Sequence, residues 1–247
     1  MRKTFKFRLL PSKVQRTRLQ RILNTCRWVY NKTLEVRRDS WQQDQISLGR
    51  YDTHNLLPGW KQEEPWLKDG HAQAIQDAQM RVDLAFRAFF RRVKEGEKPG
   101  YPRFKSKDRY DSFTFPQEKG NWRFTAEGRL HLSKIGDMRI VIHRPLEGIA
   151  KTLTIRRDAV GNWYACFSCI VEAAPLPVTD KVVGIDLGLA HFASLSNGEQ
   201  IENPRFFRQD EKALAKAQGR LSKADKGTPM RKRLKRAVQH IHQRIAN

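Results

Sequence analysis

Residues 182–189 carry the clearest indication of chemistry in the sequence. They read Val-Val-Gly-Ile-Asp-Leu-Gly-Leu, an apolar and β-branched run interrupted by two glycines and one acid, Asp186. Burial of an unpaired carboxylate costs several kcal/mol or forces a shift of its pKa. A divalent cation beside the carboxylate removes this problem. The pattern therefore predicts a strand whose Asp186 has a metal ion as its partner.

A single acid is not a nuclease site. Metal-dependent hydrolysis of a phosphodiester needs several carboxylates around paired cations, one of which activates water while the other stabilises the leaving oxygen. Actin-like ATPases share the Gly-x-Asp-x-Gly pattern, but the phosphate loop Gly-x-x-x-x-Gly-Lys does not accompany it here. Residues 191–196 predict a second strand, Asn197-Gly198 a hairpin turn and residues 200–202 a third strand. An acid-bearing strand, a hairpin and then a helix are typical of the start of an RNase H-like nuclease domain.

The charge of the chain indicates a polyanionic partner. Lys and Arg number 48 against 26 Asp and Glu, which gives a net charge of +22. Apolar runs do not approach the roughly 20 residues that cross a bilayer, and the basic, alternating N-terminus has no signal-peptide core. Nucleic acid is therefore favoured over an anionic membrane. The three cysteines cannot form a disulfide framework, which indicates the reducing cytoplasm.

The N-terminal region predicts a strand followed by a long helix. Residues 2–10 alternate between apolar and basic side chains, and Pro11 ends the strand. Ser12 is a helix N-cap with Gln15 in the capping-box position. The apolar stripe of this helix contains Leu19, Ile22, Leu23, Cys26, Val29 and Tyr30. Its opposite side carries Lys13, Arg16, Arg18 and Arg21, either as a solvated face or as contacts to phosphates.

A second long helix is expected to pair with the first. Residues 46–66 contain two glycines and two prolines, which predict loops and short turns. Asp69 or Gly70 then starts a helix that ends near residues 94–96. Its apolar stripe favours pairing with the first helix, as a helical hairpin or a small bundle.

Residues 98–107 combine aromatic and basic side chains in an irregular segment. They read Lys-Pro-Gly-Tyr-Pro-Arg-Phe-Lys-Ser-Lys, and the prolines and glycine exclude a regular element. Such a segment suits both base stacking and phosphate contact. It equally suits a basic linker whose aromatic rings pack into a nearby core.

Residues 112–172 predict a small β-barrel. Short strands are expected at residues 112–115, 122–124, 129–132, 139–142, 153–156 and 163–171, with a hairpin turn at 158–162. We place the N-terminal strand in the same barrel, so that the helices form an insertion. Cys166 and Cys169 form a Cys-x-x-Cys pair, but residues three apart in a strand face opposite sides and a second pair is lacking, so we interpret them as small buried hydrophobes.

The C-terminal region is basic and helical. Residues 175–177 are a linker, and residues 205–247 predict helices with a break near 227–229. Leu234, Val238, Ile241 and Ile245 form an apolar stripe. His240 and His242 do not share a helix face, so we do not interpret them as metal ligands.

Five segments in fixed order carry a resemblance to a known family. They are residues 5–11 (FKFRLLP), 26–31 (CRWVYN), 85–90 (AFRAFF), 100–106 (GYPRFKS) and 184–189 (GIDLGL). The chain resembles TnpB of the OrfB family, RNA-guided nucleases of insertion sequences that are related to type V CRISPR effectors. The resemblance implies an α+β fold, with a wedge-type β-barrel, an inserted helical recognition domain and the first half of an RNase H-like (RuvC) domain. The corresponding boundaries are residues 1–10 for the first barrel strand, 11–110 for the insertion, 111–174 for the rest of the barrel and 178–247 for the RuvC part.

The resemblance also implies partners and site residues. A guide RNA pairs with double-stranded target DNA, and the RuvC domain cuts with Mg²⁺ in the bacterial or archaeal cytoplasm, at the nucleoid. Asp186 matches the first RuvC acid and is the expected catalytic and Mg²⁺-binding residue. The expected nucleic-acid contacts are Gln76, Tyr101, Arg103, Phe104, Lys105, Lys107, Phe113, Thr114, Arg16 and Arg27.

The chain departs from the family after its third C-terminal strand. Family members supply a second acid (Glu), a third acid (Asp) and a four-cysteine zinc ribbon, none of which is expected in this chain. The chain is therefore expected to be an N-terminal portion, in which the stripe of Leu234 to Ile245 would face strands of a missing RuvC part. A second chain is a possible source of that part.

Three hypotheses follow. In the first, the chain binds RNA and DNA but does not cut alone. In the second, it is a nuclease-dead RNA-guided DNA binder that represses transcription or assists transposition. In the third, it is a general basic RNA-binding protein with a decayed nuclease fold, which predicts steep salt dependence without preference for a target.

Overall fold

The computed structural model contains two compact units, Met1–Ala173 and Ala174–Asn247. The structure describes residues 1–173, 179 and 182–246. The linker predicted at residues 175–177 lies outside these residues. Among the described residues, no helix is both long and apolar enough to cross a membrane.

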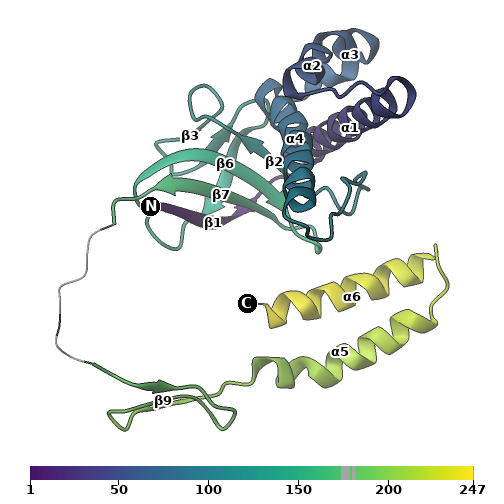
Figure 1. The fold of residues 1–247 in the computed structure, drawn as a ribbon. Helices are drawn as coiled ribbons and strands as arrows, with labels where there is room; N and C mark the ends of the chain where they lie inside the picture. Colours follow the sequence, from purple (N-terminus) through teal and green to yellow (C-terminus); the bar gives the residue numbers. More distant parts are fainter. Residues whose placement is uncertain (174–178, 180–181, 247) are drawn as a thin grey trace. The chain divides into compact units, whose positions relative to one another are not determined.

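The first unit is built on one antiparallel sheet that curves into a nearly closed barrel (Figure 1). Its strands are β1 (Arg2–Leu10), β2 (Ser112–Phe115), β3 (Trp122–Phe124), β4 (Leu130–Leu132), β5 (Gly136–Val141), β6 (Ile149–Arg157) and β7 (Trp163–Ile170). Their order in the sheet is β2-β6-β7-β1-β5-β4-β3. The prediction that the N-terminal strand joins the later strands is confirmed, because β1 pairs with both β5 and β7.

The side chains of β1, the central strand of this sheet, alternate between the core and the outer face. Phe5, Phe7 and Leu9 are buried, whereas the residues between them are exposed. Phe5 lies opposite Phe167 in the register with β7, so that the two inward faces meet. On the outer face, the ammonium of Lys6 lies 4.3 Å from the ring centre of Tyr164. The basic residues of β1 therefore remain on the outside of the barrel.

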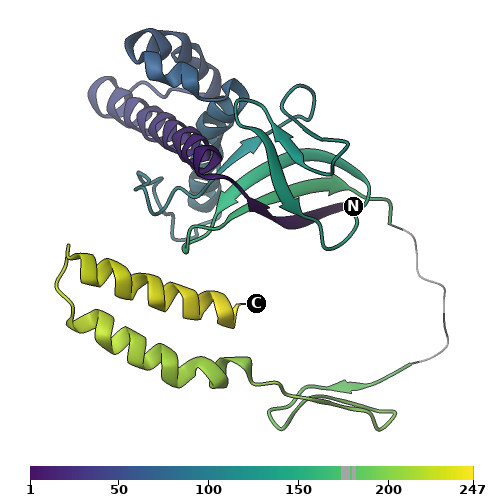
Figure 2. The ribbon, with the colours of Figure 1, turned by 180° about the vertical axis from the view of Figure 1, so that it is seen from behind.

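Five helical elements are inserted between β1 and β2. They are α1 (Lys13–Asp44), α2 (Arg50–Asn55), α3 (Leu57–Glu63), the 3₁₀ helix η1 (Pro65–Asp69) and α4 (Ala72–Lys94). Figures 1 and 2 show them gathered at one end of the barrel, with α1 and α4 side by side. The prediction that the two long helices pair is thus confirmed, and the three short helical elements between them make the group a small bundle rather than a simple hairpin.

The predicted capping box starts α1. The Ser12 hydroxyl accepts a hydrogen bond from the Gln15 backbone nitrogen (3.3 Å), and the Gln15 side chain accepts one from the Ser12 nitrogen (3.0 Å). The Gln15 amide also donates to the carbonyl of Asp137 in β5 (2.7 Å). The Gln15 side chain therefore both caps the N-terminus of α1 and fixes it to the barrel.

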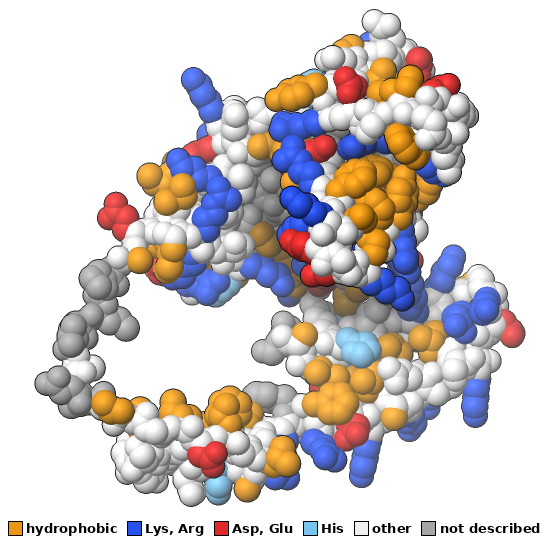
Figure 3. Space-filling view, viewed as in Figure 1, with side chains coloured by type: hydrophobic (Ala, Val, Ile, Leu, Met, Phe, Trp, Pro, Cys, Tyr) orange, Lys and Arg blue, Asp and Glu red, His pale blue; other side chains and the backbone are white. Residues whose placement is uncertain are grey.

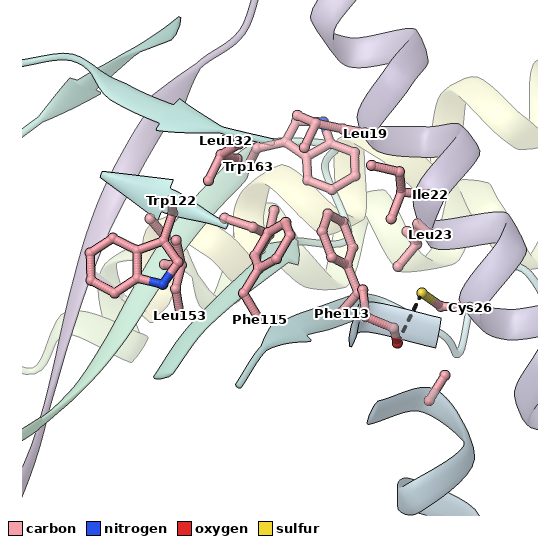
Figure 4. Close-up of a cluster of buried hydrophobic side chains, with 14 of the residues drawn as sticks. Leu19, Ile22, Leu23, Cys26, Phe113, Phe115, Trp122, Leu132, Leu153 and Trp163 are labelled. Atoms are coloured by element: carbon pink, nitrogen blue, oxygen red, sulfur yellow. Dashed lines mark hydrogen bonds between the residues drawn. The ribbon is translucent and has the colours of Figure 1, made fainter. Parts of the chain in front are cut away.

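A single hydrophobic core joins α1 to the barrel. Figure 4 shows Leu19, Ile22, Leu23 and Cys26 of α1 beside Phe113 and other barrel residues. Burial raises the pKa of the Cys26 thiol to about 12, so this group stays protonated. The helices and the barrel of the first unit therefore share their main stabilising contacts.

The prediction of loops and short turns over residues 46–66 is wrong. The structure has the short helices α2 and α3 there, followed by η1. Gly49 is the N-cap of α2, and its nitrogen donates to the Asp52 carboxylate (2.7 Å). Pro58 lies in the first turn of α3, where proline is tolerated because its missing N–H has no partner in the helix. These residues mark the starts of helices rather than interruptions.

The β6 and β7 strands bear out the prediction for the cysteine pair. Cys169 points into the core, whereas Cys166 lies half-buried on the other face of β7. Only the expectation that both are fully buried fails.

Gly148 precedes β6 with φ +71°, and a Cβ at this position would lie 2.2 Å from the Ile170 carbonyl oxygen. A side chain there would force β6 and β7 apart.

His71 makes the stability of the first unit depend on pH. Its ring meets that of Phe115 edge-on, with 4.8 Å between the centroids. Burial, together with the positive charge of Lys134, lowers the pKa of His71 below its usual 6.5. The unfolded chain then binds the proton more tightly than the folded chain does, so protonation favours unfolding. The free energy of unfolding is therefore expected to keep its maximum value above pH 6.5 and to fall as the pH drops below it.

Urea unfolding at about pH 7.5 and about pH 5.5 measures this loss. The variant His71→Leu keeps an apolar side chain against Phe115 but has nothing to titrate, so its stability is expected to change less between the two conditions. Equal losses for both proteins would show that other groups cause the pH dependence.

The second unit contains a three-stranded antiparallel sheet and two helices. Its elements are β8 (Ile185–Asp186), β9 (His191–Leu195), β10 (Gln200–Glu202), α5 (Phe206–Lys223) and α6 (Pro229–Ile245). The strand order is β10-β9-β8. The predicted hairpin turn and the helix break before Pro229 are confirmed. The predicted strand over residues 182–189 is much shorter, and Val182, Ile185 and Leu187 are exposed.

The apolar stripe of α6 lies partly against α5. The two helices contact each other, and among their described side chains Leu214 and Val238 are buried. Arg231 donates to the carbonyl of Leu221 (2.9 Å) at one end of the pair. Arg244 donates to Asp210 (3.0 Å) at the other end. Leu234, Ile241 and Ile245 of the stripe are only half-buried, so the prediction that it faces strands outside this chain stays a prediction.

Candidate nucleic-acid interface

The irregular segment 100–107 is fixed to α1 through its backbone. The Asn31 side chain donates to the carbonyl of Lys105 (3.0 Å) and accepts from the Lys105 nitrogen (2.8 Å). One amide thus satisfies both backbone groups of Lys105, as a neighbouring strand would. The segment is therefore held at its centre rather than free to move.

Its two aromatic rings rest on the helices and remain partly open to solvent. Tyr101 meets the rings of Phe86 and Phe89 of α4 edge-on, at 5.6 and 5.5 Å between centroids, and is 46% exposed. Phe104 is 45% exposed, and the guanidinium of Arg38 in α1 lies 5.2 Å from its ring centre. Rings that are braced in this way can stack with bases at a low entropic cost.

The predicted cations of the segment lie in the same short stretch of chain as these rings. Arg103 and Lys107 are exposed, and Lys105 is half-buried with its ammonium 6.0 Å from the ring centre of Tyr30. The structure therefore brings together four of the predicted contacts with Tyr101. Neither alternative for this segment holds alone, because the rings pack on the helices and also remain exposed.

The other predicted polar contacts lie on the two long helices. Arg16 and Gln76 are exposed on α1 and α4, respectively, and Arg27 is half-buried on α1. Arg16 lines a groove of about 510 Å³ together with Arg21 and Arg157. Figure 3 shows Lys and Arg side chains beside a hydrophobic patch over the helices of the first unit. The exposed apolar residues of α4 are Leu84, Phe90 and Val93.

Two of the predicted contacts, Phe113 and Thr114, lie on β2 and make contacts within the first unit. Phe113 is 0% exposed, and its ring packs edge-on against Phe115 at 5.6 Å. A ligand cannot reach it in this structure, so the prediction of a nucleic-acid contact is corrected. The hydroxyl of Thr114 accepts from Arg81 (2.8 Å) and shares a hydrogen bond with Thr154 (2.9 Å). Strand alternation alone could not tell which residues of β2 face inward.

Sequence reasoning missed Arg81, which joins α4 to β2. Its guanidinium donates to Asp77 (2.8 Å), to the Ser112 carbonyl (2.8 Å) and to Thr114 (2.8 Å). Burial raises the pKa of Asp77, and the charge of Arg81 opposes this shift. One arginine among many on a helix gives no signal in the sequence. Its half-buried position and its hydrogen bonds to β2, which only the structure reveals, set it apart.

Asp186 lies exposed in β8, opposite Ser194 of β9. The backbone nitrogen of Gly184 donates to the Ser196 hydroxyl (2.9 Å), which fixes the start of the strand. Nowhere in the described part of the chain do three or more His, Cys, Asp or Glu residues gather as a metal site would require. Glu202, on β10, instead pairs with His191 (3.1 Å). The described residues therefore do not form a two-metal site, and the catalytic role of Asp186 stays a prediction.

Comparison with protein families matches both ends of the chain. Residues 166–247 match OrfB_IS605, described as "Probable transposase", and residues 1–45 match the "Helix-turn-helix domain" of the same family. In the structure, residues 1–45 contain the strand β1 and one helix of 32 residues, not two helices joined by a turn.

Two curated proteins are similar to the whole chain. A "Putative RNA-guided DNA endonuclease" of Streptomyces pristinaespiralis is 33% identical over 100% of this chain and 61% of its own length. The "Putative RNA-guided DNA endonuclease InsQ" of Escherichia coli strain K12 is 30% identical over 98% of this chain and 59% of its own length. The chain therefore spans about three fifths of these relatives.

Among solved structures, a cryo-EM structure of a CRISPR-Cas12f ternary complex matches 86% of this chain and 54% of its own chain. The identity is 12% and the TM-score is 0.42. The order of the sequence segments, the two family matches and the two relatives are consistent with one another. Both ends of the chain are therefore similar to the OrfB_IS605 family, and nearly the whole chain is similar to two putative RNA-guided DNA endonucleases.

Proposed function

We propose that this chain is the nucleic-acid-binding portion of an RNA-guided DNA endonuclease. Residues 1–173 bind guide RNA and target DNA, and residues 178–247 contribute Asp186 to a RuvC-type site. The names of the relatives and the net charge of +22 support this proposal.

The observation that carries the proposal is the fixed segment 100–107. Its exposed rings and cations lie between two long helices, and Asn31 holds its backbone. Phosphate contacts position a nucleic acid, whereas stacking on aromatic rings engages the bases themselves. A solvated basic face without such aromatic rings would supply only the phosphate contacts.

The proposal also holds that the chain alone binds without cutting. Asp186 would be one ligand of Mg²⁺, which activates water and stabilises the leaving oxygen in such nucleases. The described residues bring no second and third ligand to it. Further acids would have to come from another part of the protein or from a second chain.

Substitution of Asp186 tests this division of roles. Asp186→Ala is expected to change the affinity for RNA and for DNA less than twofold, because the side chain lies outside the proposed interface. RNA that purifies with the chain is sequenced and synthesised, and labelled duplexes complementary to it are used for fluorescence anisotropy and for cleavage with Mg²⁺. Glu199→Ala, at the next hairpin turn, is the matched control.

Each outcome separates the hypotheses. Binding that depends on the RNA sequence, without cleavage by either protein, supports the proposal. Cleavage by the chain that is lost in Asp186→Ala but kept in Glu199→Ala would show that this part alone forms an active site. Binding that is indifferent to the RNA sequence would favour the general basic RNA-binding protein instead.

A further inference from the structure

We propose that one face of α1 binds a single-stranded stretch of nucleic acid and takes an unpaired base between Trp28 and Phe104. This inference rests on the proposed function and specifies where and how that function binds its ligand. It does not follow from the charge of the chain, because it requires two aromatic side chains at a defined place.

The binding groove lies between α1 and the segment 100–107. It has a volume of about 270 Å³ and is lined by Arg27, Trp28, Asn31, Lys32, Glu35 and Phe104. Five of these residues come from one face of α1, and Phe104 comes from the segment that Asn31 holds in place. Aromatic side chains therefore enter the groove from two separate elements.

Both aromatic side chains are held before any ligand binds. The ring of Trp28 meets those of Trp60 and Trp66 nearly at right angles, at 6.1 and 5.6 Å between centroids. Phe104 has the guanidinium of Arg38 at 5.2 Å from its ring centre. A groove that is already ordered loses little conformational entropy when a base enters.

The polar groups of the groove suit the edge of a base. The Nε atom of Arg27 is buried and has no hydrogen-bond partner in the described structure. An unsatisfied buried donor is costly, and a carbonyl oxygen or ring nitrogen of a base would satisfy it. Lys32 and Glu35 form an ion pair of 2.7 Å, and the Asn31 amide is occupied by Lys105. The Nε–H of Arg27 is therefore the donor of this groove whose hydrogen-bonding capacity is unmet in the described structure.

A second groove lies on the same face of α1, toward its N-terminus. It has a volume of about 510 Å³, and its lining includes Arg16, Gln20, Arg21 and, from the β6–β7 hairpin, Arg157. Gln20 and Asn31 mark the middle of the two grooves. Eleven residues of helix make about three turns and span about 16 Å, so the two grooves lie in line. The groove lined by Arg16, Arg21 and Arg157 suits phosphates, and the groove lined by Trp28 and Phe104 suits a base a few nucleotides away.

This arrangement favours a single strand over a duplex. In a duplex each base is stacked and paired, so its faces are not available to protein side chains. Aromatic platforms beside a basic groove are typical of proteins that bind single-stranded DNA or RNA. Because RNA and DNA share bases and phosphates, the two are compared as separate arms of one experiment.

Phe104→Ala in the complete chain tests the inference by fluorescence anisotropy. The probes are labelled single strands of about 12 nucleotides, as RNA and as DNA, and the same strands with one abasic position moved along the sequence. The affinity is expected to fall at least about fivefold, and Phe104→Trp is expected to preserve it. Tyr51→Ala is the matched control, because Tyr51 is an exposed aromatic residue (76%) on α2 that lines neither groove.

The abasic strands identify the contact. For the unaltered protein, one abasic position should weaken binding by about the same factor as Phe104→Ala, and the two changes together should add little more. Equal affinities for Phe104→Ala and Tyr51→Ala would overturn the inference, as would a loss from Phe104→Ala that is the same on a wholly abasic strand. If the unaltered chain bound no nucleic acid at all, the proposed function itself would fail.

Discussion

Replacement of Arg81 by methionine is expected to lower the free energy of unfolding of the first unit by about 3–5 kcal/mol. The change removes hydrogen bonds from α4 to Asp77, to the Ser112 carbonyl and to the Thr114 hydroxyl. It also leaves the carboxylate of Asp77, which is buried, without its cation. Removing one partner of a buried ion pair costs more free energy than the pair itself contributes, because the remaining buried charge has no compensating partner.

Urea unfolding followed by tryptophan fluorescence measures this loss. Arg87→Met is the matched control, since Arg87 lies on the same helix and also pairs with an acid four residues earlier, but is largely exposed. It should cost less than about 1 kcal/mol. The double variant Asp77→Leu/Arg81→Met should recover much of the stability, because it strands no charge. Equal losses for Arg81→Met and Arg87→Met would show that burial adds nothing to this contact.

The affinity of the chain for nucleic acid is expected to fall by about 10³- to 10⁵-fold between about 50 and about 200 mM salt. A fall of this size corresponds to about 6 to 10 phosphate contacts, each of which releases condensed counterions. The net charge of +22 and the arginines of the α1 groove, Arg16, Arg21 and Arg157, are the basis of this expectation. Electrostatic binding of this kind does not depend on sequence.

Anisotropy titrations at several NaCl concentrations give the slope of the logarithm of the affinity against the logarithm of the salt concentration. Arg16→Gln should reduce this slope by about 1, because one phosphate contact is lost. Arg50→Gln on α2, which lines neither α1 groove, should leave it unchanged. A slope near zero for the unaltered chain would contradict the proposed interface. The same slope for all three proteins would place the phosphates away from Arg16.

Arg81→Met and Arg16→Gln report on different parts of the first unit. Arg81 fixes the barrel to the helices, and Phe104 and Arg16 are exposed on surfaces that this attachment supports. If Arg81→Met lowers the free energy of unfolding but leaves the salt dependence of the affinity unchanged, the contacts that hold the fold are separate from those that bind nucleic acid. This separation matters because a destabilised variant can lose binding for trivial reasons.

Local patterns were sufficient to predict much of the fold. Alternation along β1 set its inward face, and Ser12 with Gln15 set the start of α1. These features depend on residues that are neighbours in sequence, so tertiary contacts are not needed to recognise them. The same patterns misled at Gly49 and Pro58, because both residue types occur in turns and also at helix starts.

The site was predicted less completely for a physical reason. Aromatic and basic residue types identified the segment 100–107, but only tertiary contacts show that Asn31 holds it and that Trp28 faces the same groove as Phe104. Residue type likewise could not distinguish Phe113, which is buried, from Phe104, which is exposed.

By itself the sequence determined the resemblance to one family, the basic character of the chain and the elements that local periodicity specifies. Only the tertiary structure decided which side chains are accessible. It buried Phe113, made Arg81 a link between α4 and β2, left Asp186 exposed in a two-residue strand and buried Val238 of the α6 stripe. Burial depends on what packs against a residue from distant parts of the chain, and a residue's own neighbours in sequence do not contain that information.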